Sequence, residues 1–216
     1  MSHKFNNYQK AATSLVVVVL VIIGWLYVSH RSYAPIPPTK TKNVITYSTP
    51  KPSEAPVSQA AYTSTAGPNE PKYISLPSIG AEGFIQKMGI DQDNQVAAPN
   101  NVNLAGWYVN SLSPGQAGLS IIDGHVDGLH GPGIFFHLDK LNTGDTFTIE
   151  MGNGATKTFK VISVTNVDDA GASTALFSRD NSIVSQLNLI TCGGSFDQQS
   201  HRYNQRTIVV STLAGS

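Results

Sequence analysis

The sequence predicts an all-β domain, mainly strands with short helices, that folds as an eight-stranded barrel or sandwich. We expect this domain at residues 73–216, after a tail at 1–10, a transmembrane helix at 11–28 and a flexible linker at 29–72. Three observations support the prediction: short apolar or alternating runs broken by Gly, Pro, Asn and Asp, one long uncharged window, and one proline-rich stretch. A chain of 216 residues then carries one globular domain on a tether.

The window at residues 11–28 contains 18 residues and no charged side chain. As a helix it is about 27 Å long, close to the ~30 Å hydrocarbon core of a bilayer. Trp25 and Tyr27 near its end fit the interfacial belt of a membrane. A cleaved signal peptide is the main alternative, but only Ser32 and Ala34 supply small residues for a cleavage site. We therefore favour an uncleaved anchor over a signal peptide or a buried core helix.

Charge and proline divide the rest of the chain. Eight of the twelve prolines lie between Arg31 and Pro71, a stretch without apolar periodicity that predicts a disordered tether. Six Lys or Arg residues precede the first acidic residue, Glu54, whereas from Tyr73 onward there are seven basic and twelve acidic residues. The net charge of zero thus hides an acidic domain, and this composition argues against a nucleic-acid partner.

Eight short segments have the pattern of β-strands. They cover residues 73–76, 83–88, 104–108, 119–124, 146–150, 158–165, 187–191 and 207–212. Met151-Gly152-Asn153-Gly154 predicts a hairpin turn, because Asn and Gly tolerate positive φ. Residues 133–138 predict a turn or two of helix, and 182–186 fit either element.

Three predicted strands end or begin at a reactive or charged side chain. Cys192 is the single cysteine, so it forms no internal disulfide, and it lies between an apolar run and Gly193-Gly194. This placement makes it a candidate nucleophile, provided that a cation favours its thiolate. His125 ends one strand and Arg206 opens another. A guanidinium stays charged at neutral pH and stabilises an oxyanion.

Simpler interpretations remain open at the level of single residues. A lone cysteine is often a small buried hydrophobe, an isolated His is often structural, and an isolated Arg is often a surface charge. Asp123, His125 and Asp127 alternate along a strand, which is a possible metal-binding pattern, although the other histidines lack zinc-like spacing. His201 and Arg202 are second choices for the roles of His125 and Arg206. No cofactor and no metal are expected.

Together, these residues resemble the sortase family. Leu189-Ile190-Thr191-Cys192 is similar to the end of the Thr-Leu-x-Thr-Cys signature of sortases, with Asn188 in place of the first Thr. The family also has a histidine after an upstream strand and an arginine at the start of the last strand. Further stretches resemble the class F branch, at residues 105–108, 124–127, 131–138, 141–145 and 191–197. The resemblance covers nearly the whole domain.

The resemblance implies an eight-stranded sortase-type β-barrel with cysteine transpeptidase activity. Cys192 would attack the Thr–Gly bond of an LPXTG-like sorting signal, and an amine of a peptidoglycan precursor or a pilin would resolve the thioacyl enzyme. His125 would be the general acid and base, and Arg206 would stabilise the oxyanion. Thr191, Arg202 and Asp127 are the substrate-binding candidates, where Arg202 also rivals Arg206 and Asp127 also fits a carboxylate partner of His125.

The resemblance also implies a location and a role. The loop at 168–181 occupies the place of the substrate-recognition loop. The domain is expected outside the cytoplasm on a single-pass anchor with its N-terminus inside. Because no second apolar helix follows the last strand, general surface anchoring is expected rather than pilus assembly. Two alternatives stay open: a cysteine peptidase or amidase that transfers the acyl group to water, and a tethered adhesin or wall-binding domain without catalysis.

Overall fold

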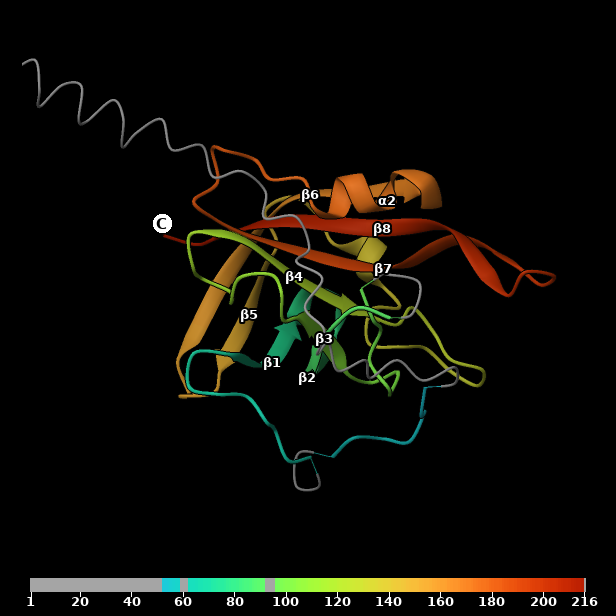
Figure 1. The fold of residues 1–216 in the computed structure, drawn as a ribbon, viewed down its shortest axis with the longest axis horizontal. Coiled ribbons are helices and arrows are strands. Elements are labelled where there is room, and N and C mark those ends of the chain that lie inside the picture. Colours follow the sequence, from blue (N-terminus) through green and yellow to red (C-terminus); the bar gives the residue numbers. More distant parts are fainter. Residues whose placement is uncertain (1–51, 59–61, 92–95, 216) are drawn as a thin grey trace, which may run out of the picture. The chain divides into compact units, whose positions relative to one another are not determined.

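Eight strands close into one barrel in the computed structural model, which describes residues 52–58, 62–91 and 96–215 (Figure 1). The order around the barrel is β1-β2-β3-β4-β7-β8-β6-β5. The strands are β1 (Pro71–Leu76), β2 (Ala81–Met88), β3 (Ala105–Tyr108), β4 (Gly118–Gly124), β5 (Thr146–Met151), β6 (Thr156–Asp168), β7 (Ser185–Asp197) and β8 (Arg202–Leu213). The predicted eight-stranded barrel is confirmed.

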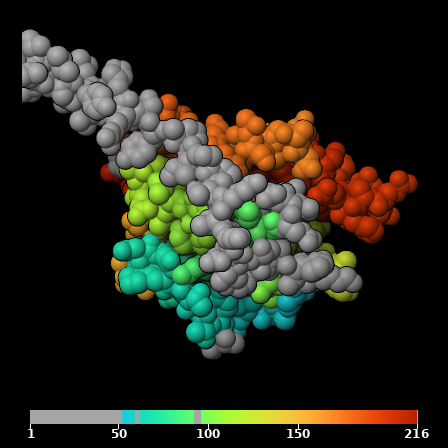
Figure 2. All heavy atoms as spheres, viewed as in Figure 1, coloured from blue at the N-terminus to red at the C-terminus, as the bar shows by residue number. Residues whose placement is uncertain are grey.

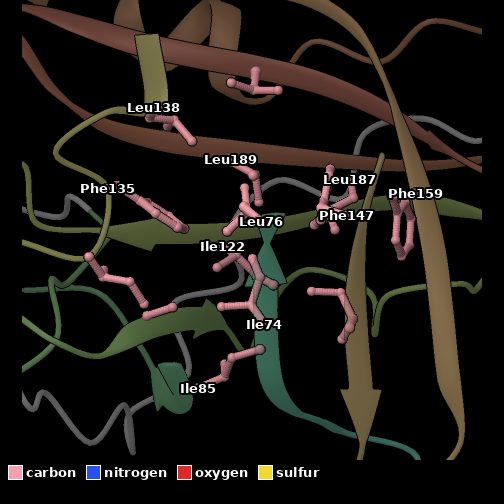
Figure 3. Packing of buried hydrophobic residues seen from close by; sticks show 14 of the residues in the cluster. Ile74, Leu76, Ile85, Ile122, Phe135, Leu138, Phe147, Phe159, Leu187 and Leu189 are labelled. Carbon is pink, nitrogen blue, oxygen red and sulfur yellow. The ribbon is translucent and has the colours of Figure 1, made fainter. Parts of the chain in front are cut away.

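Alternate residues of the strands fill the barrel with one apolar cluster (Figure 3). Ile74 and Ile122 are fully buried in it, and Leu187 and Leu189 enter it from β7. The rings of Phe147 and Phe159 stack there with their centroids 5.7 Å apart. Fully burying one such side chain contributes about 1.5–3 kcal/mol to the stability of the fold. The cluster therefore supports the strands from inside the barrel, behind their outer face.

Strands β6, β7 and β8 are longer than the sequence predicts. They contain 13, 13 and 12 residues. The mostly polar residues 192–197 and 202–206, which lie outside the predicted strands, extend β7 and β8, and Phe196 and Asp197 pair with Tyr203 and Arg202. Ladder hydrogen bonds do not need apolar side chains, so the hydrophobic pattern reveals only the buried part of each strand. The end of this β7–β8 hairpin, in red, extends at the right-hand edge of the view in Figure 2.

Helix α2 (Asp169–Leu176) lies within the loop predicted at 168–181. Asp168 caps it, because its Oδ1 accepts a hydrogen bond of 2.7 Å from the Gly171 amide. Ala172 and Leu176 are buried, and the helix lies along β8 (Figure 1). Within the part of the chain that the structure describes, the other regular elements are two 3₁₀ turns, η1 (Pro77–Ile79) and η2 (Leu138–Lys140).

The expected anchor at 11–28 lies outside the described residues. Within 52–58, 62–91 and 96–215, no helix has the length and apolar character needed to span a membrane. Part of the expected linker is described and is bonded to the domain. Ser53 donates its amide to Asn100 at 2.7 Å and accepts from the Val102 amide at 2.9 Å.

Candidate active site

The strand register places three predicted site residues in one row. Cys192 on β7 pairs directly with Arg206 on β8. On the other side of β7, the parallel ladder with β4 ends where Asp123 pairs with Ile190. Continuing this register by two residues would bring His125, which follows β4 directly, level with Cys192. Leu187 and Leu189 point into the barrel, so Ile190 and Cys192, which alternate with them along β7, lie on its outer face. We call His125, Cys192 and Arg206 the catalytic row.

His125 is held at its position by a backbone oxygen. It follows β4 directly, and its Nε2 lies 2.7 Å from the carbonyl oxygen of Pro99. Burial lowers the pKa of the imidazole below its usual value, although the Pro99 carbonyl and the Asp127 charge oppose this change. The neutral imidazole is therefore favoured in the free protein at neutral pH.

Arg206 is fixed by three contacts. Its Nη1 donates to the carbonyl oxygens of Tyr203 at 3.1 Å and Gln205 at 2.9 Å, and its Nη2 lies 2.8 Å from Oδ1 of Asp169. The Arg206 side chain is only 15% exposed. Since Asp169 opens helix α2, this ion pair connects the predicted recognition loop to the catalytic row.

Cys192 is the single cysteine of the chain and is partly buried as a free thiol. Burial raises the pKa of the thiol above its usual value, and the charges of Asp127 and Asp169 act in the same direction. Arg206 alone among the named neighbours lowers it. The free protein thus holds Cys192 mainly as a thiol, so a reactive thiolate requires the guanidinium nearby.

The three substrate-binding candidates lie in different places. Thr191 is buried, and its hydroxyl donates to the Gly124 carbonyl oxygen at 2.7 Å, which ties β7 to the residue before His125. Asp127 accepts a hydrogen bond from the Tyr203 hydroxyl through its Oδ2. Arg202 is exposed and pairs with Asp197 near the tip of the hairpin, whereas Arg206 faces Cys192. Contact of Thr191, Asp127 or Arg202 with a substrate stays a prediction.

Tyr203 was not singled out in the sequence, yet it contacts two parts of the site. Its hydroxyl binds Asp127, two residues past His125, and its carbonyl oxygen accepts from Arg206. Burial, followed by the hydrogen bond to Asp127, raises the pKa of Tyr203 to about 12. Tyr203 therefore stays protonated and keeps donating to Asp127 at physiological pH.

Asn188, the departure from the family signature, supports the loop predicted to recognise the substrate. It is fully buried, its Nδ2 donates to the Leu176 carbonyl oxygen at 2.7 Å, and its Oδ1 accepts from Gln186 at 2.9 Å. Gln186 in turn donates to the Ser178 carbonyl oxygen at 2.9 Å. The amide of Asn188 thus fixes the end of helix α2, whose start carries Asp169.

A cavity of about 340 Å³ lies beside the loop that follows His125 rather than at Cys192. Its lining includes Glu54 and His130. Glu54 accepts hydrogen bonds from the amides of Leu129 at 2.6 Å and His130 at 3.0 Å. Among the described residues, no three His, Cys, Asp or Glu side chains are grouped to hold a metal ion.

The catalytic row provides the groups for acyl transfer through a thioester. It contains a thiol nucleophile, an imidazole that can donate or accept a proton, and a fixed guanidinium opposite the sulfur. Sequence reasoning missed three residues that act on this row: Asp169, Tyr203 and the Pro99 carbonyl. The only available signal was the place of Asp169 in the predicted recognition loop, because the other two contacts depend on how distant segments meet.

Comparison with known proteins identifies the family of this arrangement. The family model described as the sortase domain matches residues 74–214. A search among curated proteins finds no match.

Solved structures of similar fold include three sortases. A lid mutant of sortase A from Corynebacterium diphtheriae is 21% identical with a TM-score of 0.53, covering 70% of this chain and 74% of its own. A lid mutant of sortase C1 from Streptococcus agalactiae has 18% identity, a TM-score of 0.51 and coverage of 70% and 72%. A sortase D5 transpeptidase from Clostridium perfringens has 21% identity, a TM-score of 0.50 and coverage of 68% and 79%. At this identity the likeness shows the fold, and the class F assignment stays a prediction.

Proposed function

The chain belongs to the sortase family of cysteine transpeptidases, and from this premise we propose that it joins secreted proteins to a cell-wall amine through a thioester on Cys192. The donor would be an LPXTG-like sorting signal. The acceptor would be the amine of a peptidoglycan precursor or a similar group. The observation that carries the proposal is the direct pairing of Cys192 with Arg206, with His125 directly after β4, the strand on the other side of β7.

The first half of the reaction would form the thioester. The Cys192 thiolate attacks the carbonyl carbon of the Thr–Gly bond, and Arg206 stabilises the resulting oxyanion. The C–N bond then breaks, and protonated His125 gives its proton to the leaving amine. Cys192 and His125 exchange one proton before attack, because the neutral pair dominates in the free protein.

The second half would transfer the acyl group. Neutral His125 accepts a proton as the incoming amine attacks the thioester carbonyl, and the Cys192 sulfur leaves as a thiolate. A new amide bond replaces the one that was broken. His125 then returns its proton to the Cys192 thiolate, which restores the neutral pair of the free protein. Arg206 enters this cycle already paired with Asp169. The substrate oxygen therefore either shares the guanidinium with that carboxylate or displaces the carboxylate from it.

Mass spectrometry of the protein with an LPXTG peptide and an amine tests the proposal. We expect a thioester adduct on Cys192, a ligated peptide product, and neither species with Cys192→Ala. Only hydrolysed peptide would instead favour a cysteine peptidase. Peptide cleavage that persists in Cys192→Ala would contradict the mechanism, and an inert thiol that gives no product would favour an adhesin.

We also propose that residues 11–28 anchor the enzyme in the membrane with the domain outside. Support comes from the uncharged window and from the family's action on secreted proteins. Cys192 is the only thiol, so a membrane-impermeant maleimide applied to intact cells reports its side of the membrane. Labelling only after cell lysis would contradict the proposal.

A further inference from the structure

A buried carboxyl group lies one step below the catalytic row. Asp123 on β4 pairs with Gly106 on β3 and with Ile190 on β7, and Ile190 pairs with Ile208 on β8. Asp123 precedes His125 by two residues, so both side chains lie on the same face of the strand. Two residues along a strand span about 7 Å, so the positions of Asp123 and His125 are about 7 Å apart. An extended peptide covers that distance with about two residues.

The carboxyl group of Asp123 has no partner for one of its oxygens. Asp123 is 8% exposed, and its Oδ1 is buried without a hydrogen bond. Burial raises the pKa of this carboxyl well above its usual value and so favours its protonated form. A buried polar group without a partner destabilises the fold, and an apolar residue at this position would avoid that cost.

The neighbouring strand leaves room for this group. Gly106 faces Asp123 across the β3–β4 ladder, and a Cβ atom there would collide with the Asp123 Oδ1. The side chains of Met88 and Pro99 also approach this position. Pro99 carries the carbonyl that holds His125, so the unpaired carboxyl adjoins the support of the catalytic row.

We infer that Asp123 is a specificity-determining residue, which forms a hydrogen bond with a hydroxyl or carboxamide side chain of the peptide bound over Cys192. This inference rests on the proposed function. A protonated carboxyl both donates and accepts, and so do hydroxyl and carboxamide groups. An apolar side chain in their place leaves the carboxyl unpaired, and this mismatch is the basis of strong discrimination. Because Asp123 lies about 7 Å from the catalytic row, the peptide residue that it binds should be within about two positions of the scissile bond.

Competition between matched peptides tests this inference. The full chain and its Asp123→Leu and Asp123→Asn variants receive pairs that differ at one position as Thr against Val, or Asn against Leu. Thioester formation on Cys192 gives the ratio of kcat/KM within each pair. Glu82→Gln, which removes an exposed carboxyl on β2, is the matched control.

We expect the wild type to favour the polar member at one position by about tenfold or more. Asp123→Leu should lose that preference at this position alone, with equal or higher thermal stability, because it removes an unpaired buried group. Asp123→Asn should keep part of the preference, since a carboxamide also donates and accepts. Glu82→Gln should match the wild type.

Equal preferences in the wild type and Asp123→Leu would overturn the inference. An equal loss for all peptides together with lower stability would overturn it as well, by showing a packing role. Both results leave the proposed function standing, because the wild type still forms the thioester. If no peptide acylates wild-type Cys192, the proposed function itself fails.

Discussion

Asp169 at the start of helix α2 forms an ion pair of 2.8 Å with Arg206, the residue that faces Cys192 across the β7–β8 ladder. The charge of Asp169 raises the pKa of the Cys192 thiol, whereas that of Arg206 lowers it. The loop predicted to recognise the substrate therefore acts on the Cys192 thiol through one carboxylate.

Asp169→Asn should make Cys192 more reactive at neutral pH. Removal of the carboxylate lowers the pKa of the thiol and leaves the Arg206 charge less compensated. A partly exposed ion pair is worth about 0.2–1 kcal/mol, so the rate of alkylation by iodoacetamide should rise by about 1.4- to 5-fold. Asp168→Asn is the control, since it removes the adjacent charge and asparagine still caps the helix. Equal rates in Asp169→Asn and wild type would contradict a direct effect on the thiol.

Arg206→Gln should nearly abolish thioester formation. Loss of a fixed oxyanion donor typically lowers kcat by about 10²- to 10³-fold. Arg202→Gln should have little effect, because Arg202 is exposed at the hairpin tip and pairs with Asp197 rather than Cys192. Stopped-flow or quenched acylation assays separate the two variants. The opposite order of activities would assign the role to Arg202.

Asn188→Leu should destabilise the fold. The substitution removes the donor to the Leu176 carbonyl and the acceptor for Gln186, both inside the protein. Each buried group left unpaired costs about 1–3 kcal/mol of unfolding free energy. Urea denaturation measures the loss, and Gln199→Ala, in the exposed hairpin tip, should stay within about 0.5 kcal/mol. Unchanged stability would show that the end of helix α2 does not depend on Asn188.

Asp123→Leu should change how stability depends on pH. The raised pKa of Asp123 means that the folded state keeps a proton which the unfolded state releases above about pH 3.9. The wild type therefore loses stability relative to the variant as pH rises from about 4 toward the folded-state pKa, and the difference becomes constant above it. Denaturation of both proteins between pH 4 and 8 gives this difference. A difference independent of pH would mean that Asp123 is ionised in the folded state.

Much of the fold was predictable from the sequence, because each strand buries one face. Short apolar or alternating runs, such as those around Ile74, Ile122 and Leu189, located all eight strands. The single Cys192 identified the candidate nucleophile. Helix α2 and the polar ends of β7 and β8 were not predicted. Their residues are mostly exposed, so hydrophobic periodicity carries little information there.

The sequence by itself determined the residue types of the site and the strand ends that carry them, because local pattern encodes burial. Only the tertiary structure decided which strands are neighbours. The β7–β8 register sets Arg206 rather than Arg202 opposite Cys192, and barrel closure brings Asp169, Tyr203 and the Pro99 carbonyl to the catalytic row. Such contacts join segments far apart in the chain, so they depend on pairing and packing energies that no local stretch contains.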